Sequence, residues 1–207
     1  MSDSSAVTTV DLLRHGSCEG GEIYRGSTDS TLSEEGWQQM RDALAQAAGW
    51  QSIVSSPLSR CRLFADAFGA DAQLPVLHDE AFREVHFGEW EGRLLRDIWR
   101  EFPELSSDFY RDPERITPPG AEPMLAARER ACEGWTRLLQ QCRGQTVLLV
   151  SHGGIIRLLL SHLLDLPVAS VARLHIPYAS LSRVQVYHSS EGDFPVLHSL
   201  NAGGLSQ

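Results

Sequence analysis

The chain has 207 residues, a formal net charge of -9 at pH 7 and 42% hydrophobic residues. This length suits one large domain better than two, and the apolar share allows a sizeable core. The acidic balance argues against broad binding to nucleic acid, which needs a basic surface, and against docking on an anionic membrane.

The cysteines and the apolar stretches bear on the compartment. The four cysteines form no CxxC pair, which is typical of free thiols in a reducing cytosol. Residues 1–11 are polar and lack the basic start and apolar run of a signal peptide. The longest apolar stretch, residues 153–164, is too short and too interrupted to span a bilayer. We therefore expect a cytoplasmic protein.

Strands and helices alternate along the first part of the chain. Residues 7–14 predict a strand. Ser33 is a suitable N-cap for a helix that runs to about residue 48. Residues 52–56 predict a short buried strand, and a second helix is expected just after Pro57.

The remainder of the chain continues this alternation after a break. Prolines interrupt residues 97–123, so the wider segment 93–123 is expected to be a lid-like insertion of short helices and loop. Apolar residues at helical spacing predict a long amphipathic helix over 125–142. Residues 146–152 are continuously apolar, as in a strand covered on both faces. Residues 181–201 alternate in polarity and predict an antiparallel hairpin.

This order of elements favours an α/β fold. We expect a three-layer α/β/α arrangement with a mostly parallel sheet and an antiparallel edge. A single domain over residues 1–207 is expected to carry it.

Three of the predicted strands end in residues that suit a phosphate group. Arg14 and His15 end the first strand, and Arg60 follows the second. His152 ends the last apolar strand, and Gly153 opens the helix after it. Ligands of open α/β sheets bind beyond the carboxyl ends of the strands, so these side chains are expected in one crevice. Arginine offers paired donors to phosphate oxygens, and a helix start offers backbone amides.

The imidazoles of His15 and His152 can have different roles in phosphoryl transfer. One can attack phosphorus as a neutral nucleophile while the other donates to the phosphoryl oxygens. The departing alkoxide needs a proton, and the segment 82–92 supplies three candidate acids: Glu84, Glu89 and Glu91.

Four aromatic residues are candidates for stacking on a ring of the substrate: Tyr24, Phe87, Trp90 and Trp99. Packing in the core or the lid is the favoured interpretation for Phe87 and Trp99.

Four segments, LLRHG, SSPLSRC, FREVHFGEWEG and VSHGGIIR, occur in this order along nearly the whole chain. With them the chain resembles the histidine phosphatase superfamily, the phosphoglycerate-mutase-like group. The resemblance implies that His15 is transiently phosphorylated and that Glu84 is the proton donor. It also implies that Arg14, Arg60 and His152 hold the phosphoryl group. No metal or other cofactor is expected.

The segments YRGSTDSTLSEEG and FGEWEG make the resemblance closest to the α-ribazole phosphatase branch. Its members remove phosphate from α-ribazole 5′-phosphate during cobalamin nucleotide-loop assembly. This likeness implies substrate contacts at Arg25 and Gly26 and, through the segment PPGAEP, a second glutamate at Glu122. Cys18 and Gly21 depart from the threonine and asparagine that are usual at these positions.

Several alternatives remain open, and a broad-specificity sugar or nucleotide phosphatase is the main one. A phosphoglycerate mutase fits the same pocket, but Leu95 aligns where mutases carry a substrate-binding lysine. A non-catalytic phospholigand-binding module is disfavoured because every pocket residue is present. A metal-dependent hydrolase is disfavoured because Arg14 beside His15 repels a cation. The partner is expected to be a small phosphomonoester of unspecified identity, and the sequence does not distinguish a monomer from a homo-oligomer.

Overall fold

A computed structural model describes residues 6–202; the terminal residues of the predicted 1–207 domain lie outside this range. Its centre is a six-stranded sheet in the order β3-β2-β4-β1-β5-β6. The strands are β1 (Val7–Arg14), β2 (Ser52–Ser55), β3 (Val76–His78), β4 (Thr146–Ser151), β5 (Leu181–Ser189) and β6 (Gly192–Ala202). The strands β1 to β4 run parallel, and the hairpin β5–β6 is antiparallel at one edge, as predicted.

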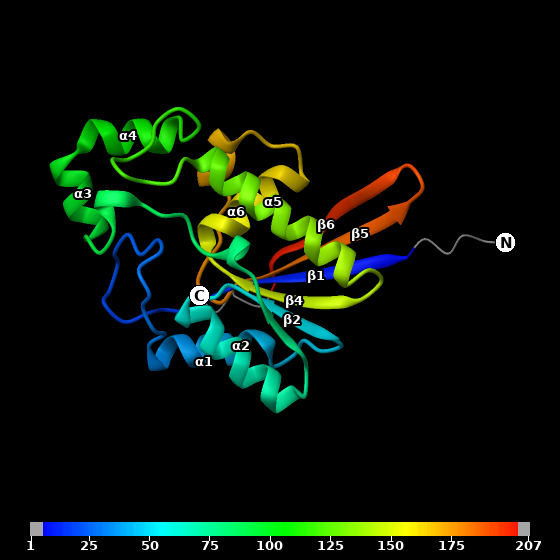
Figure 1. Cartoon of the computed structure of the whole chain (residues 1–207). Helices are drawn as coiled ribbons and strands as arrows, with labels where there is room; N and C mark the ends of the chain where they lie inside the picture. Colours follow the sequence, from blue (N-terminus) through cyan, green and yellow to red (C-terminus); the bar gives the residue numbers. More distant parts are fainter. Residues whose placement is uncertain (1–5, 203–207) are drawn as a thin grey trace.

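Helices cover both faces of the sheet (Figure 1). The α-helices are α1 (Glu34–Leu44), α2 (Ser59–Ala72), α3 (Leu95–Glu101), α4 (Pro103–Arg111), α5 (Met124–Gln141) and α6 (Gly153–Leu163). Short 3-10 helices are η1 (Glu80–Phe82), η2 (Gly88–Trp90) and η3 (Val168–Arg173). The pair α1 and α2 lies on one face and the pair α5 and α6 on the other, which gives the three layers expected from the sequence.

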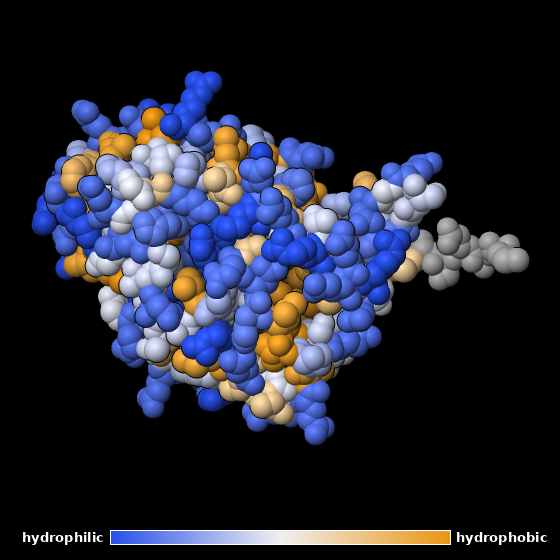
Figure 2. Space-filling model, in the orientation of Figure 1, coloured by the Kyte–Doolittle hydropathy of each residue, from blue (hydrophilic) through white to orange (hydrophobic). Residues whose placement is uncertain are grey.

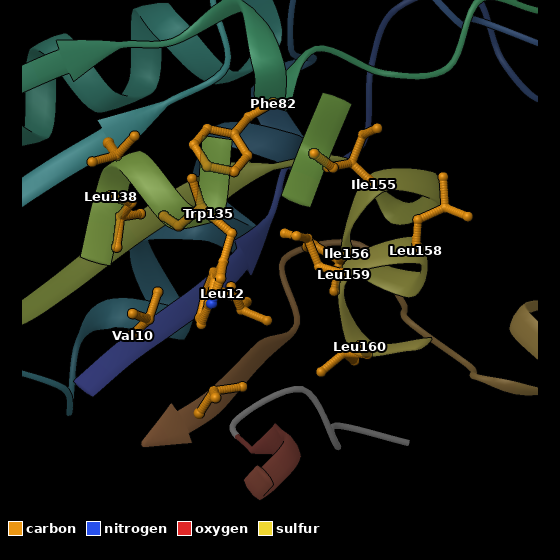
Figure 3. Close-up of a cluster of buried hydrophobic side chains, with 14 of the residues drawn as sticks. Val10, Leu12, Phe82, Trp135, Leu138, Ile155, Ile156, Leu158, Leu159 and Leu160 are labelled. Atoms are coloured by element: carbon orange, nitrogen blue, oxygen red, sulfur yellow. The ribbon is translucent and has the colours of Figure 1, made fainter. Parts of the chain in front are cut away.

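Side chains of the central strands alternate between these two faces. Val10 and Leu12 of β1 belong to the core cluster that packs with α5 and α6, together with Trp135 (Figure 3). Leu13 of β1 and Val150 of β4 belong to the cluster that packs with α1 and α2. The sheet is therefore buried on both faces, which explains why the sequence of β4 is apolar without alternation.

Two local predictions differ from the structure. Helix α1 begins after its predicted cap, Ser33, but ends at Leu44 rather than near residue 48. The chain turns there and buries Trp50, whose indole N–H donates to Asp11 at 2.9 Å. Strand β3 was not predicted, because three residues are too few to show a period.

The segment 93–123 forms α3, α4 and a loop, which pack as a separate small cluster around Trp90, Ile98 and Phe109. Trp90 is only 1% exposed, so it is a core residue and not a stacking partner for a substrate. Trp99 is exposed and stacks on Tyr110 with ring centroids 5.4 Å apart. Whether this segment moves as a lid stays a prediction.

The surface is of mixed character. Figure 2 shows a face on which hydrophilic residues predominate, with hydrophobic ones scattered among them. Across residues 6–202, every helix falls short of the length and apolar character needed to cross a bilayer.

Candidate active site

The carboxyl ends of three neighbouring strands, β2, β4 and β1, lie side by side at one edge of the sheet. Arg14 at the end of β1 is in register with Ser151 at the end of β4, and the His15 N–H donates to the Ser151 carbonyl at 3.0 Å. A cavity of about 390 Å³ opens at this edge, and Arg14, His15, Arg60 and Glu84 line it. The predicted convergence of these distant segments is therefore present.

The glycine after His15 is required for close packing. A Cβ at Gly16 would lie 2.2 Å from the Gly36 carbonyl oxygen, which is far inside van der Waals contact. Gly36 lies in the first turn of α1, and its N–H donates to the Ser33 hydroxyl at 3.1 Å. The end of β1 and the start of α1 therefore touch through two glycines, and this contact fixes the backbone beside His15.

His15 is held in one tautomer. Its Nδ1 lies 2.8 Å from the Gly16 carbonyl, which can only accept, so Nδ1 carries the proton. Nε2 has no hydrogen-bond partner among the described residues and keeps its lone pair. Burial and the neighbouring Arg60 and Arg14 guanidinium groups hold the pKa of His15 well below 6.5. The imidazole is therefore neutral at neutral pH, as a nucleophile requires.

His152 lies next to His15, with ring centroids 5.2 Å apart, but it does not line the cavity. It is fully buried. Its Nδ1 accepts from the Arg60 Nε–H at 3.1 Å, so Nε2 carries the proton and donates to the Ser56 hydroxyl at 2.7 Å. Burial and Arg60 hold its pKa well below 6.5. In this arrangement His152 orients Arg60 and has no free donor for a phosphoryl group.

Arg60 is wholly buried in the first turn of α2 yet reaches the cavity wall. Besides its bond to His152, Nη1 donates to the Thr28 carbonyl at 2.9 Å and Nη2 to the Gly26 carbonyl at 2.7 Å. Gly26 also lines the cavity, with φ at 49°. Its carbonyl accepts a hydrogen bond from Arg60, and Arg60 also bonds to His152. This guanidinium therefore links the loop after Tyr24 to His152.

Arg14 and Arg25 keep donors free on the cavity side. Arg14 Nη1 donates to the Ile176 carbonyl at 2.5 Å, and its guanidinium carbon lies 4.0 Å from the centre of the Tyr178 ring. Arg25 Nη2 donates to the Gly21 carbonyl at 2.6 Å. The Nε atoms of both arginines are buried and have no partner within the described part of the chain. Arg14 Nη2 and Arg25 Nη1 also make no hydrogen bond among the described residues, and these atoms can donate to an oxyanion in the cavity that both side chains line.

Glu84 is the one predicted acid that reaches the cavity. Its Oε2 accepts from the Gly154 N–H at 3.1 Å, and its Oε1 accepts from the Val85 N–H at 3.0 Å. A Cβ at Gly154 would lie 2.4 Å from Oε1. The second glycine after His152 is therefore required because the carboxylate lies directly on the start of α6.

The other glutamates considered from the sequence do not line the cavity. Glu91 accepts from the Ser27 N–H at 2.7 Å and the Phe87 N–H at 3.0 Å. Burial acts to raise the pKa of Glu91, but these hydrogen bonds hold it below 4.5. The predicted substrate contact Glu122 is instead paired with Arg130 at 2.8 Å, which fastens its loop to α5. Glu89 does not line the cavity either.

Cys18 and Gly21, the two departures from the usual pattern, make local contacts near His15 and Arg25. The Cys18 thiol lies 3.6 Å from both His15 Nδ1 and the Gly16 carbonyl, and burial raises its pKa, so it is a neutral thiol. Gly21 supplies its carbonyl to Arg25. Among the described residues, no three His, Cys, Asp or Glu side chains gather closely enough to hold a metal ion.

Arg157 is a cavity residue that the sequence analysis missed. Its Nε donates to the Leu174 carbonyl at 2.7 Å, and its Nη atoms make no hydrogen bond within residues 6–202. A Cβ at Gly153 would lie 3.1 Å from Arg14 Nε and 3.2 Å from Arg157 Nη1, so the two guanidinium groups flank this glycine. The signal was available, because Arg157 lies four residues after Gly153 on the same helix face.

Tyr178 is the second residue that was missed. Its ring packs on Arg14 and lies 5.6 Å from the His15 ring. It precedes β5, which runs antiparallel to β1, so the start of β5 lies beside the end of β1. The Ala179 N–H donates to the His15 carbonyl at 3.2 Å. Only the strand order, which the sequence did not specify, places it there.

The fold is an α/β fold with a mixed sheet. Two histidines and several arginines lie at the carboxyl ends of its parallel strands, which suits a phosphate-bearing ligand. A profile of the histidine phosphatase superfamily (branch 1) matches residues 10–201 of the chain. The chain belongs to this superfamily.

Curated relatives include two phosphatases with different named substrates. A glucosyl-3-phosphoglycerate phosphatase of Mycolicibacterium vanbaalenii is 33% identical over 60% of this chain and 57% of its own length. An adenosylcobalamin/α-ribazole phosphatase of Escherichia coli is 28% identical over 58% of this chain and 61% of its own length. A bifunctional protein of Mycobacterium tuberculosis is 37% identical over 64% of this chain, which spans only 37% of that relative. The chain thus spans less than two thirds of each.

Solved structures with the same fold extend over nearly the whole chain. The mycobacterial glucosyl-3-phosphoglycerate phosphatase aligns with a TM-score of 0.84 at 29% identity, covering 95% of this chain and 99% of its own. A putative α-ribazole-5′-P phosphatase of Escherichia coli aligns with a TM-score of 0.80 at 26% identity, covering 94% and 96%. These likenesses establish the fold and leave the substrate undecided between two named classes.

Proposed function

We propose that the chain is a phosphomonoesterase that acts through a phosphohistidine on His15. The observation that carries this proposal is the state of the imidazole: Nδ1 is committed to the Gly16 carbonyl, and Nε2 is unbonded among the described residues. His15 lines the cavity together with Arg14 and Arg25, each of which keeps an unbonded Nη atom. A neutral nucleophile beside donors for phosphoryl oxygens is what attack on a phosphate ester needs.

In the first step, His15 Nε2 donates its lone pair to phosphorus, and the bond between phosphorus and the ester oxygen breaks. Arg14 and Arg25 stabilise the phosphoryl oxygens, and Arg60 adds its charge from the buried wall. Glu84 gives a proton to the departing oxygen.

In the second step, water attacks the phosphohistidine and Glu84 takes its proton. The bond between phosphorus and Nε2 breaks, the lone pair returns to His15, and inorganic phosphate leaves. The roles of Arg14, Arg25, Arg60 and Glu84 are supported by their position in the cavity lining. In contrast to the role implied by family resemblance, His152 acts here through Arg60, since both of its nitrogens are engaged.

The first candidate substrate is α-ribazole 5′-phosphate. It is supported by the similarity to the Escherichia coli phosphatase and by the aromatic side chains of Tyr24 and Phe87 in the cavity wall, which suit a benzimidazole ring. A glucosyl-3-phosphoglycerate ester is the second candidate, favoured by the mycobacterial relatives. A panel of phosphomonoesters that includes both, ranked by kcat/KM, decides between them and a broad-specificity enzyme.

The intermediate itself supplies the test of the proposed chemistry. Acid-labile, alkali-stable phosphoenzyme should accumulate when the protein is mixed rapidly with p-nitrophenyl phosphate and denatured in alkali. The peptide that contains His15 should carry the phosphoryl group by mass spectrometry. Turnover without any phosphopeptide would overturn the covalent mechanism. Incubation with a phosphoglycerate separates a phosphatase, which releases phosphate, from a mutase, which returns an isomer.

A further inference from the structure

The cavity has a second half that the phosphoryl chemistry does not use. On the side away from the strand ends, its wall consists of apolar side chains: Ile23, Phe87, Leu95, Phe109, Met124 and Val171. Within residues 6–202, the cavity lining contains no serine, threonine, asparagine, glutamine, aspartate or lysine side chain. These are the side chains that proteins ordinarily offer to sugar hydroxyls.

The polar atoms that do occur in this half are few and largely engaged. The hydroxyls of Tyr24 and Tyr110 lie 3.2 Å apart and bond to each other. Arg157 lies between the two halves, near Glu84 and Gly153 on one side and Tyr110 on the other. Tyr178 also lines the cavity, but it packs on Arg14 at the phosphoryl end. A hydroxyl-rich group in the outer half would therefore give up hydrogen bonds to water without replacing them.

Aromatic rings shape this wall. Tyr24 and Phe87 meet edge to face with centroids 5.3 Å apart, and Phe87 and Phe109 meet at 6.5 Å. Such an arrangement leaves ring faces and edges for a planar or cyclic apolar group. At about 390 Å³ the cavity has room for a phosphoryl group and at least one such ring.

We propose that this enzyme selects phosphomonoesters whose alcohol half carries a ring-sized apolar group, in preference to phosphates of plain sugars. Of the two candidate substrates named above, α-ribazole 5′-phosphate carries such a ring and a glucosyl-3-phosphoglycerate ester does not. The inference rests on the proposed phosphatase function and narrows its substrate class. It places the main determinant of selectivity on the outer wall formed by α3, α4, the start of α5 and η3.

A matched pair of substrates tests the preference. Cyclohexylmethyl phosphate and glucose 6-phosphate are both esters of a primary carbon attached to a six-membered ring, and they differ chiefly in ring hydroxyls. We expect kcat/KM to favour the cyclohexylmethyl ester by about 100-fold or more, since an apolar pocket discriminates against added hydroxyl groups to roughly this extent. p-Nitrophenyl phosphate serves in parallel as the general assay of phosphatase activity.

Two neighbouring residues on α5 provide a matched pair of variants. Met124 lines the cavity, whereas Leu125 is 42% exposed and does not. Met124→Gln should lower the ratio of the two kcat/KM values about 10-fold by adding an amide to the wall. Leu125→Gln should leave the ratio unchanged. Leu95→Gln, at the start of α3, repeats the test from another element if Met124→Gln folds poorly.

The outcomes separate this inference from the function on which it rests. No turnover of any ester, p-nitrophenyl phosphate included, removes the proposed function. Turnover with a ratio near one, or a preference for glucose 6-phosphate, overturns the inference and leaves the phosphatase function intact. A high ratio that neither wall variant lowers also overturns it, because the selectivity then arises elsewhere.

Discussion

The two ends of the cavity are built in opposite ways. At the phosphoryl end, hydrogen bonds hold the functional side chains: Arg60 donates to two backbone carbonyls, and Glu84 accepts from a backbone amide at the start of α6. At the outer end, apolar side chains come from short helices and loops, and packing alone holds them. We infer from this difference that the sheet positions the residues that react with the phosphoryl group, while short peripheral elements determine which substrate binds. These elements can change in sequence without disturbing the reacting residues.

The largest effect is expected at the nucleophile. His15→Asn should lower kcat by at least about 10⁴-fold, because His15 is the one histidine among the described residues that lines the cavity. Both substrate turnover and the phosphopeptide should disappear together. The exposed His162→Asn variant serves as the matched control. A folded His15→Asn protein with wild-type turnover would eliminate the covalent mechanism.

Glu84 should show the next largest effect, and one that depends on the substrate. Glu84→Gln should lower kcat/KM for alkyl phosphates roughly 10²- to 10⁴-fold. The loss should be smaller for p-nitrophenyl phosphate, whose leaving oxygen needs less protonation. Glu89→Gln, outside the cavity lining, is the control. Equal losses on both substrates would mean that Glu84 is not the acid.

Arg157 lies at the boundary between the two ends and should show an intermediate effect. Replacing it by leucine removes Nη donors that have no protein partner among the described residues. We expect kcat/KM to fall about 10- to 100-fold, as for loss of a charge-assisted hydrogen bond. Arg157→Lys should keep part of the activity that Arg157→Leu loses. The exposed Arg173→Leu, as the control, should leave kcat/KM unchanged. Unchanged kinetics in Arg157→Leu would leave Arg157 outside the site.

Low pH should lower the free energy of unfolding, because two histidines are buried at the phosphoryl end. Burial and adjacent guanidinium groups depress the pKa values of His15 and His152 in the folded protein, whereas unfolded histidines titrate near 6.5. The unfolded state therefore binds more protons below this pH, and stability is lost as the pH falls. Each histidine contributes a slope of about 1.4 kcal/mol per pH unit. Urea unfolding at a series of pH values should show the summed slope, and His152→Asn should lower it by the share of one histidine.

The smallest effect should come from Glu122, and it should appear in stability and not in turnover. Glu122→Gln weakens the paired hydrogen bonds with Arg130, so the free energy of unfolding should fall by about 1–2 kcal/mol. kcat/KM should stay close to wild type, because Glu122 does not line the cavity. The exposed Glu104→Gln is the control for charge removal. A large loss of kcat/KM with unchanged stability would return Glu122 to the substrate site.

The sequence predicted the phosphoryl end of the cavity better than the outer end. The strand ends that carry Arg14, His15 and His152 follow from apolar runs that stop abruptly at polar residues, and parallel strands bring such ends together. The outer wall did not follow, because it depends on packing between distant segments. Trp90 is an example: its aromatic ring made it a candidate for stacking on a substrate, yet it packs with Phe109 in the core, with ring centroids 5.6 Å apart.

Glu122 shows the limit of similarity in a short segment. Its expected substrate contact came from the likeness of the segment PPGAEP and stays a prediction. In the structure, Arg130, eight positions later on α5, pairs with the carboxylate, and Glu122 does not line the cavity. No local pattern reports such a competing cation. Arg157, in contrast, was readable from helical spacing alone.

The bond from His15 Nδ1 to the Gly16 carbonyl also decides the regiochemistry of the adduct. Only the tele nitrogen can accept phosphorus, so the enzyme should form 3-phosphohistidine and never the 1-isomer. Antibodies that distinguish the two isomers would then report how much of the protein is trapped in mid-cycle, without any knowledge of its natural ester.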